Sequence, residues 1–310
     1  MGKKVLINEV GLRDGLQIQP KFVPTNGKLE IAKALIEAGV KSFEAASFVS
    51  PKAVPQMSDS SELFKSLPKR DDLYYSALLF NHKGYERAVE SGAKSIAIAL
   101  ASTEKMNLAN IRMSLSDAIT NLGKIIKIAK SDGLDTRAYI STALGCPYEG
   151  DVPIDTVIQL ADKMFQLGAD KIAIADTIGS GGPALVEELV SSAAKKFGAE
   201  NLIVHFHDTR ALGLINAWVA LKIGVTEFDT SLGGLGGCPF APGAAGNLAT
   251  EDLAFMLNDA GYETGISINK VREAVLIAEG YTGQKLGGRI SQWWISQERK
   301  KAASVASAAE

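Results

Sequence analysis

Two histidines spaced two residues apart are the side chains in this chain whose type and spacing most directly suit chemistry. His205 and His207 lie in the run Leu202-Ile-Val-His-Phe-His-Asp-Thr209, which predicts a β-strand that ends in a turn. Side chains of a strand alternate between its faces, so both imidazoles point the same way and can share one divalent ion. The alternative is a pair of core histidines satisfied by hydrogen bonds. The chain has only three histidines, which favours a metal site.

Asp14 is the best candidate for a carboxylate ligand beside these histidines. It follows residues 5–10, an apolar run that predicts the first strand. In a closed barrel this strand lies beside the last strand and near the histidine strand. With Asn247 as a fourth ligand, such an oxygen-rich set favours Mg²⁺ or Mn²⁺ over a closed Zn²⁺ site. The alternative interpretation of Asp14 is a turn or capping residue.

Arg13 and Cys238 are the other residues that could act on a substrate. Arg13 can hold a carboxylate, a phosphate or an enolate oxygen, or form a salt bridge to Glu9 or Glu44, and the two roles are compatible. Cys238 lies in the glycine-rich segment 233–246, which lacks the lysine of a Walker loop and can move as a lid. Its thiol could serve as an acid or nucleophile, or be incidental.

Apolar runs that alternate with helical patterns predict the elements that position these residues. Segments with apolar residues at i, i+3 and i+4 separate the runs, and several end in glycine before the next strand. Eight β/α units favour a (β/α)8 TIM barrel, an α/β fold, over an open doubly wound sheet, which usually has fewer strands. The predicted strands are 5–10, 42–47, 74–80, 95–100, 136–143, 171–176, 202–207 and 227–231.

The C-terminal part predicts extra helices after the eighth strand, at 248–257, 268–279 and 284–298. We therefore expect one catalytic domain over residues 1–300. The small and polar residues 301–310 predict a disordered tail.

Composition excludes several classes of partner. The 33 basic and 35 acidic residues leave no basic field for nucleic acid or an acidic membrane surface. No apolar run is long enough to span a membrane. Two cysteines give no disulfide framework, and the N-terminus enters a strand at once, which leaves no room for a signal peptide. We therefore expect a cytoplasmic protein.

The active site of such a barrel lies at the C-terminal ends of its strands. Polar and ionisable side chains follow six of the predicted strands and would converge on this mouth. Besides the residues above, they include Gln17, Glu44, Ser47, Asp176 and Glu251.

These stretches together resemble the 3-hydroxy-3-methylglutaryl-CoA lyases, members of a superfamily of metal-dependent lyases and synthases with TIM barrels. The leucine at position 16, where the synthases usually have Glu, and the lack of room for a further domain favour the lyase branch. The matching motifs are Glu9-Val-Gly-Leu-Arg-Asp-Gly-Leu-Gln17, Glu44-Ala-Ala-Ser-Phe-Val-Ser-Pro-Lys52, Ala143-Leu-Gly-Cys-Pro-Tyr-Glu-Gly150, Asp176-Thr-Ile-Gly179, His205-Phe-His-Asp-Thr209, Gly234-Leu-Gly-Gly-Cys-Pro-Phe240 and Gly246-Asn-Leu-Ala-Thr-Glu-Asp252.

The resemblance implies a role for each matching residue. It implies Arg13 as the group that stabilises an enolate, Cys238 as the catalytic thiol, and an acyl-CoA substrate with a homodimeric assembly. Lys21 and Lys52 are candidates for contact with CoA. The implied metal ligands are Asp14, His205, His207 and Asn247, and the residues that line or support the site are Gln17, Glu44, Ser47, Asp176 and Glu251.

The implied reaction is a retro-Claisen cleavage to acetyl-CoA and acetoacetate. Either His205 or Asp14 would take the hydroxyl proton, and Cys238 would return a proton to the enolate carbon. Arg210 departs from the family pattern and could alter which acyl group is accepted. The alternatives are the same cleavage of citramalyl-CoA or a longer branched hydroxyglutaryl-CoA, a condensing enzyme, and a non-catalytic metal- or CoA-binding barrel.

Overall fold

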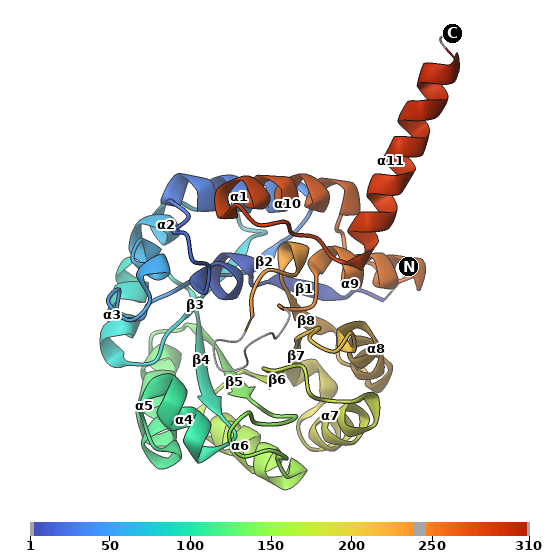
Figure 1. The fold of residues 1–310 in the computed structure, drawn as a ribbon. Helices are drawn as coiled ribbons and strands as arrows, with labels where there is room; N and C mark the ends of the chain where they lie inside the picture. The colour runs from blue at the N-terminus through green and yellow to red at the C-terminus, as the bar shows by residue number, and fades with distance from the viewer. Residues whose placement is uncertain (1–2, 238–245, 309–310) are drawn as a thin grey trace.

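The computed structural model describes residues 3–237 and 246–308, and its strands form one closed parallel barrel (Figure 1). β1 pairs with both β2 and β8, so the sheet has no free edge. The predicted TIM barrel is confirmed, and the open doubly wound sheet is excluded by this closure. The strands are β1 (Leu6–Glu9), β2 (Ser42–Ser47), β3 (Tyr74–Leu78), β4 (Ser95–Ala101), β5 (Asp135–Ser141), β6 (Lys171–Asp176), β7 (Leu202–Phe206) and β8 (Glu227–Thr230).

Helices surround the barrel and occupy the segments between strands, where the apolar spacing predicts them. Gly168 and Gly224 end α6 and α8 in the left-handed conformation that the Leu-Gly and Ile-Gly pairs predict. α2 and α4 were not predicted, because they are short and carry little apolar periodicity. The helices that follow strands within the barrel are α1 (Thr25–Glu37), α2 (Ser60–Ser66), α3 (His82–Glu90), α4 (Glu104–Ile111), α5 (Leu115–Ser131), α6 (Ile154–Leu167), α7 (Pro183–Phe197) and α8 (Gly213–Ile223).

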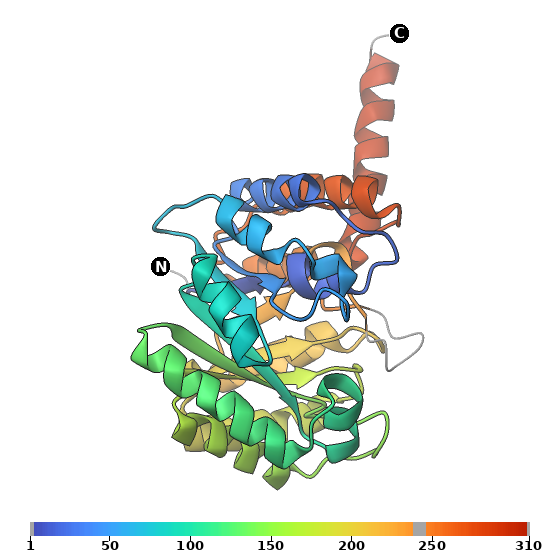
Figure 2. The same ribbon diagram turned by 90° about the vertical axis from the view of Figure 1, so that its left-hand side faces the viewer.

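Among the described residues, three α-helices follow β8, as predicted: α9 (Thr250–Asp259), α10 (Ile268–Thr282) and α11 (Arg289–Ala308). α10 packs against α1, whereas α11 extends away from the barrel (Figures 1 and 2). The carboxylate of Asp252 caps α11 by accepting hydrogen bonds from the backbone N–H groups of Arg289 and Ile290. The helix continues through Ala308, into the segment for which the sequence predicts disorder. Alanine and lysine in this segment are good helix formers.

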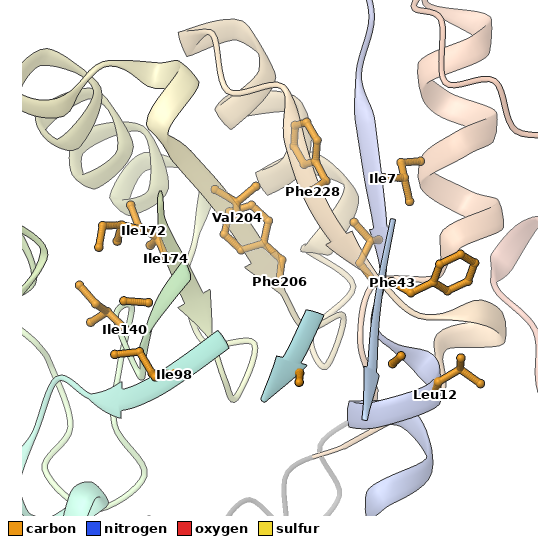
Figure 3. Close-up of a cluster of buried hydrophobic side chains, with 14 of the residues drawn as sticks. Ile7, Leu12, Phe43, Ile98, Ile140, Ile172, Ile174, Val204, Phe206 and Phe228 are labelled. Atoms are coloured by element: carbon orange, nitrogen blue, oxygen red, sulfur yellow. The ribbon is translucent and has the colours of Figure 1, made fainter. Parts of the chain in front are cut away.

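The two faces of the barrel strands carry different side chains. On β7, Leu202, Val204 and Phe206 point outward into the apolar layer beneath the helices, part of which is shown in Figure 3. Ile203 belongs to a small separate cluster, and His205 lies on the same strand face. That cluster contains Ala97, Ala173 and Ala175, whose small side chains leave space for larger polar groups inside the barrel.

No helix in the described part of the chain combines the length and apolar character needed to cross a lipid bilayer.

Candidate active site and metal centre

The two histidines at the end of β7 face each other. Their Nε2 atoms lie 3.3 Å apart, and both side chains are buried. A carboxylate oxygen of Asp14 joins them, so that the three potential ligand atoms all lie within 4.8 Å of one another. The structure thus brings together the three residues that the sequence proposes as metal ligands.

The donor set fits one divalent cation. Two nitrogens that each lie about 2.1 Å from an ion, at a right angle, are about 3 Å apart, close to the separation of the two Nε2 atoms. Lone pairs that face one another in a buried site are unfavourable unless a proton or a metal ion lies between them. Imidazole nitrogens with a carboxylate suit Mn²⁺, Mg²⁺ or Zn²⁺.

Asn247 has the properties expected of a fourth ligand. Its Nδ2 donates to Asp14 Oδ2 at 2.8 Å and to the Leu235 carbonyl at 2.9 Å, and its backbone pairs with that of His207. Its Oδ1 is buried and has no hydrogen-bond partner among the described residues. A buried acceptor without a partner costs about 1–3 kcal/mol, and an ion at this position would remove that cost.

A single π-helical turn after β1 positions Arg13 and Asp14 beside the two histidines. Residues Gly11–Gly15 form one π-helical turn, in which the N–H groups of Arg13 and Asp14 both point at the Val10 carbonyl. Gly11 packs closely here: a Cβ there would lie 2.3 Å from Leu232 Cδ2 and 2.6 Å from Glu9 Oε1, so both side chains would have to shift. Such wide turns are rare and concentrate at functional sites.

Arg13 joins two acidic residues. Its Nε and Nη2 contact Glu44 Oε1, and its Nη1 contacts Asp14. Of the two salt-bridge partners that the sequence offers, Glu44 is the correct one. Glu9 instead accepts hydrogen bonds from the backbone N–H groups of Gly11 and Leu232 and from the Thr250 hydroxyl.

The charges around Asp14 decide its protonation. Burial alone would raise its pKa, but Arg13 and the two histidines outweigh that effect and lower the pKa to about 2. Asp14 is therefore a carboxylate at neutral pH and a weak base.

His205 has a partner that the sequence analysis missed. Its Nδ1 lies 3.2 Å from Oδ2 of Asp229 on β8. Burial by itself would lower the pKa of His205, but the hydrogen bond and the charge of Asp229, with that of Asp14, raise it. The sequence did contain a signal for this partner: Asp229 lies within the predicted strand 227–231. Both faces of a barrel strand are buried, so an acid there needs a polar partner.

The residues expected to line the substrate site divide into two groups. Gln17 and Glu44 contact residues of the site: Gln17 Nε2 donates to Asp14 at 3.2 Å, and Glu44 accepts from Arg13. Ser47 lies at the C-terminal end of β2. Glu44 Oε2 and Ser47 Oγ are buried without hydrogen-bond partners among the described residues. Asp176 and Glu251 instead hold backbone in place. Asp176 accepts from two N–H groups in the turn after β6, and Glu251 accepts from N–H groups of two separate loops.

Cys238 lies outside the described residues. Two positions earlier, Gly236 passes against the site: a Cβ there would lie 2.3 Å from Asn247 Nδ2 and 3.5 Å from Asp14 Oδ2. The described chain that leads to the cysteine therefore passes close to Asn247, whose Nδ2 also donates to the carbonyl of Leu235 in this segment. Lys21 and Lys52 are both exposed, and Arg210 donates to the Gly179 carbonyl at 2.7 Å.

Comparisons with known proteins agree with this geometry. Residues 4–276 match the family model described as HMGL-like. The chain is 40% identical over 287 residues to a hydroxymethylglutaryl-CoA lyase of Bacillus subtilis, which covers 93% of this chain and 96% of the relative. It is 43% identical over 272 residues to the mitochondrial hydroxymethylglutaryl-CoA lyase of Bos taurus, covering 88% and 84%.

A solved structure shows the same fold with ligands bound. An HMG-CoA lyase from Acinetobacter baumannii, in complex with coenzyme A and 3-methylmalate, superimposes with a TM-score of 0.89. The two chains are 36% identical, and the match covers 93% of this chain and 94% of the other.

Proposed function

This chain belongs to the HMGL-like family of hydroxymethylglutaryl-CoA lyases, and from that premise we propose that it cleaves 3-hydroxy-3-methylglutaryl-CoA to acetyl-CoA and acetoacetate. It is then a carbon–carbon lyase. The observation that carries the proposal is the convergence of Asp14, His205 and His207 on one point, directly beside the buried guanidinium of Arg13.

The reaction explains why these residue types lie together. The bond that breaks joins the tertiary alcohol carbon to the carbon next to the thioester carbonyl. The hydroxyl proton passes to a carboxylate oxygen of Asp14, because a carboxylate keeps free lone pairs while it holds an ion. The hydroxyl oxygen then becomes the ketone oxygen, and the electron pair of the broken bond passes to the thioester enolate. A bound divalent ion, which we propose to be Mg²⁺ or Mn²⁺, would lower the pKa of the substrate hydroxyl. Asp14, His205, His207 and Asn247 would hold it.

Arg13 supplies the positive charge that the enolate requires. Its guanidinium is held by Glu44 and Asp14 and is largely buried, so it need not reorganise when charge develops. Because Gly236 lies against Asn247, we propose that Cys238 delivers the proton to the enolate carbon. The carbon–carbon bond is then fully replaced by a C–H bond and a C=O bond.

The remaining assignments are also proposals. The Acinetobacter relative binds coenzyme A, and we infer that this chain binds the CoA part of its substrate, with the exposed Lys21 and Lys52 as candidate contacts. We keep the homodimer, the cytoplasmic location and the division into one domain and a tail as predictions. A bovine relative is mitochondrial, so location varies among relatives.

The experiment that tests the function is acetyl-CoA release from 3-hydroxy-3-methylglutaryl-CoA and from citramalyl-CoA, with Mg²⁺ or Mn²⁺ and then with EDTA. We expect fast, EDTA-sensitive release from the first compound. Release from citramalyl-CoA alone would keep the mechanism and move the substrate assignment. No release from either compound would overturn the proposal.

A further inference from the structure

A hydrogen-bonded network lies inside the barrel, directly beneath the proposed metal ligands. At its centre is Asp229, which is buried. Its Oδ2 accepts from the Tyr139 hydroxyl at 2.6 Å and faces His205 Nδ1 at 3.2 Å. Its Oδ1 accepts from Asn8 Nδ2 at 2.8 Å and lies 3.7 Å from Arg137 Nη1. Four groups from β1, β5 and β7 therefore hold this one carboxylate.

The network determines which nitrogen of His205 carries the proton. A carboxylate can only accept hydrogen bonds, so the Nδ1 that faces Asp229 must be the N–H. In a neutral imidazole the lone pair is then on Nε2, the atom that faces His207. The Tyr139 ring packs against His205 at an interplanar angle of 88°, with 5.9 Å between ring centroids, and so restricts rotation of the imidazole.

We propose that Asp229, itself held by Asn8, Tyr139 and Arg137, is a positioning residue that fixes the Nδ1–H tautomer and ring orientation of His205, so that Nε2 faces the divalent ion. The inference rests on the proposed metal site and deepens it. Partners of this kind, behind a ligating histidine, typically change metal affinity 10- to 100-fold when they are removed.

Glu227 provides a matched control on the same strand. It lies two residues before Asp229, is also buried, and contacts the same arginine, with 3.2 Å between Arg137 Nη2 and Glu227 Oε1. Its other oxygen contacts Lys171, and none of its described contacts is with His205. Substituting Glu227 therefore removes a buried carboxylate from the same network without touching the metal ligands.

The first experiment compares Asp229→Asn with Glu227→Gln by titrating Mn²⁺ into metal-free protein, followed by calorimetry, with Tm measured for each variant. We expect D229N to bind Mn²⁺ about 10- to 100-fold more weakly than the wild type, and E227Q to stay within about twofold. A purely structural role would lower Tm in both variants and leave both affinities unchanged, which would overturn the inference.

A measurement on the wild-type protein tests the proposed tautomer of His205 even if D229N does not fold. The ¹⁵N shifts of the imidazoles in metal-free protein at pH 8, assigned with the His82→Gln variant and the His207→Ala variant, report each tautomer. Protonation of His205 on Nδ1 supports the inference, and protonation on Nε2 overturns it.

The Mn²⁺ titration separates this inference from the proposed metal site. If the wild type binds no Mn²⁺ at all, the proposed metal site and this inference both fail. If the wild type binds Mn²⁺ and D229N binds it with the same affinity, the metal site stands and this inference alone fails.

Discussion

The two ends of the barrel both bury charged side chains, but they differ in how those charges are matched. At the C-terminal end of the strands, Asp14, His205 and His207 direct acceptor atoms at one another. At the N-terminal end, Glu227 is contacted by Arg137 on one oxygen and by Lys171 on the other. A cavity of about 420 Å³ opens at this N-terminal end.

The difference teaches which feature identifies a site. In the N-terminal cluster, which lines a sizeable cavity, acids face bases: both oxygens of Glu227 contact a cation, and the group left without a hydrogen bond among the described residues is a donor, Arg137 Nη1. In the C-terminal cluster acceptor atoms face one another, an arrangement that a proton or a bound cation would stabilise. It also contains Oδ1 of Asn247 and Oε2 of Glu44, which have no hydrogen-bond partner among the described residues. Unmatched buried acceptors, more than cavity volume, therefore point to the functional end.

The largest expected effect is that of His207→Ala. Removing one nitrogen ligand should weaken Mn²⁺ binding and lower kcat by at least about 10³-fold, because stabilisation by a metal ion contributes several kcal/mol. The measurements are acetyl-CoA release and Mn²⁺ titration, with Tm as the control for folding. Wild-type turnover with wild-type Mn²⁺ affinity would show that the converging atoms are not ligands.

Arg13→Lys should have the next largest effect, a fall in kcat of about 10²–10³-fold with little change in Mn²⁺ affinity. Lysine keeps the charge but cannot contact Asp14 and Glu44 at the same time through a planar fork. Steady-state kinetics at saturating metal separate kcat from KM. A rise in KM alone would assign Arg13 to substrate binding and contradict its role at the enolate.

Cys238→Ala should lower kcat by about 10²-fold, the lower range for loss of a general acid. Mn²⁺ affinity should stay at the wild-type value, because the thiol is not among the proposed ligands. Cys146→Ala is the matched control. Cys146 is buried, and its Sγ is hydrogen-bonded to the Thr103 hydroxyl and to the backbone N–H of Tyr148. If Cys238→Ala keeps the kcat of the wild type, as Cys146→Ala is expected to do, Cys238 is not the acid.

The sequence predicts the ligand end of the barrel better than the network beneath it. Strand alternation alone puts His205 and His207 on one face, and closure of the barrel brings Asp14 beside them. Asp229 and Tyr139 are 90 residues apart, and no local pattern shows that their side chains meet inside the barrel. The π-helical turn that carries Arg13 also has no periodic signature, and its geometry depends on close contact with Leu232.

Glu9 is a buried acid at the C-terminal end of the barrel that we expect to affect stability and not catalysis. Burial raises its pKa to about 7 from 4.5. Between these values the folded state keeps a proton that the unfolded state loses, so the stabilising contribution is present below pH 4.5 and is lost as the pH rises through 7. Glu9→Gln should flatten this dependence by at most about 3 kcal/mol and leave kcat near the wild-type value. Urea unfolding from pH 4.5 to 8 measures it, and parallel curves for both proteins would contradict the assignment.

The smallest effect is expected at the opposite end of the barrel, for Lys171→Met. The side chain of Lys171 is 38% exposed, so solvent screens its ion pair, and Glu227 keeps its contact with Arg137. The unfolding free energy should fall by no more than about 1 kcal/mol. Neither kcat nor Mn²⁺ affinity should change, because the described contacts of Lys171 end at Glu227, one layer below Asp229. A clear fall in Mn²⁺ affinity at unchanged Tm would mean that charge at the N-terminal end acts on the ligands through Arg137, and the two ends would then be one functional unit.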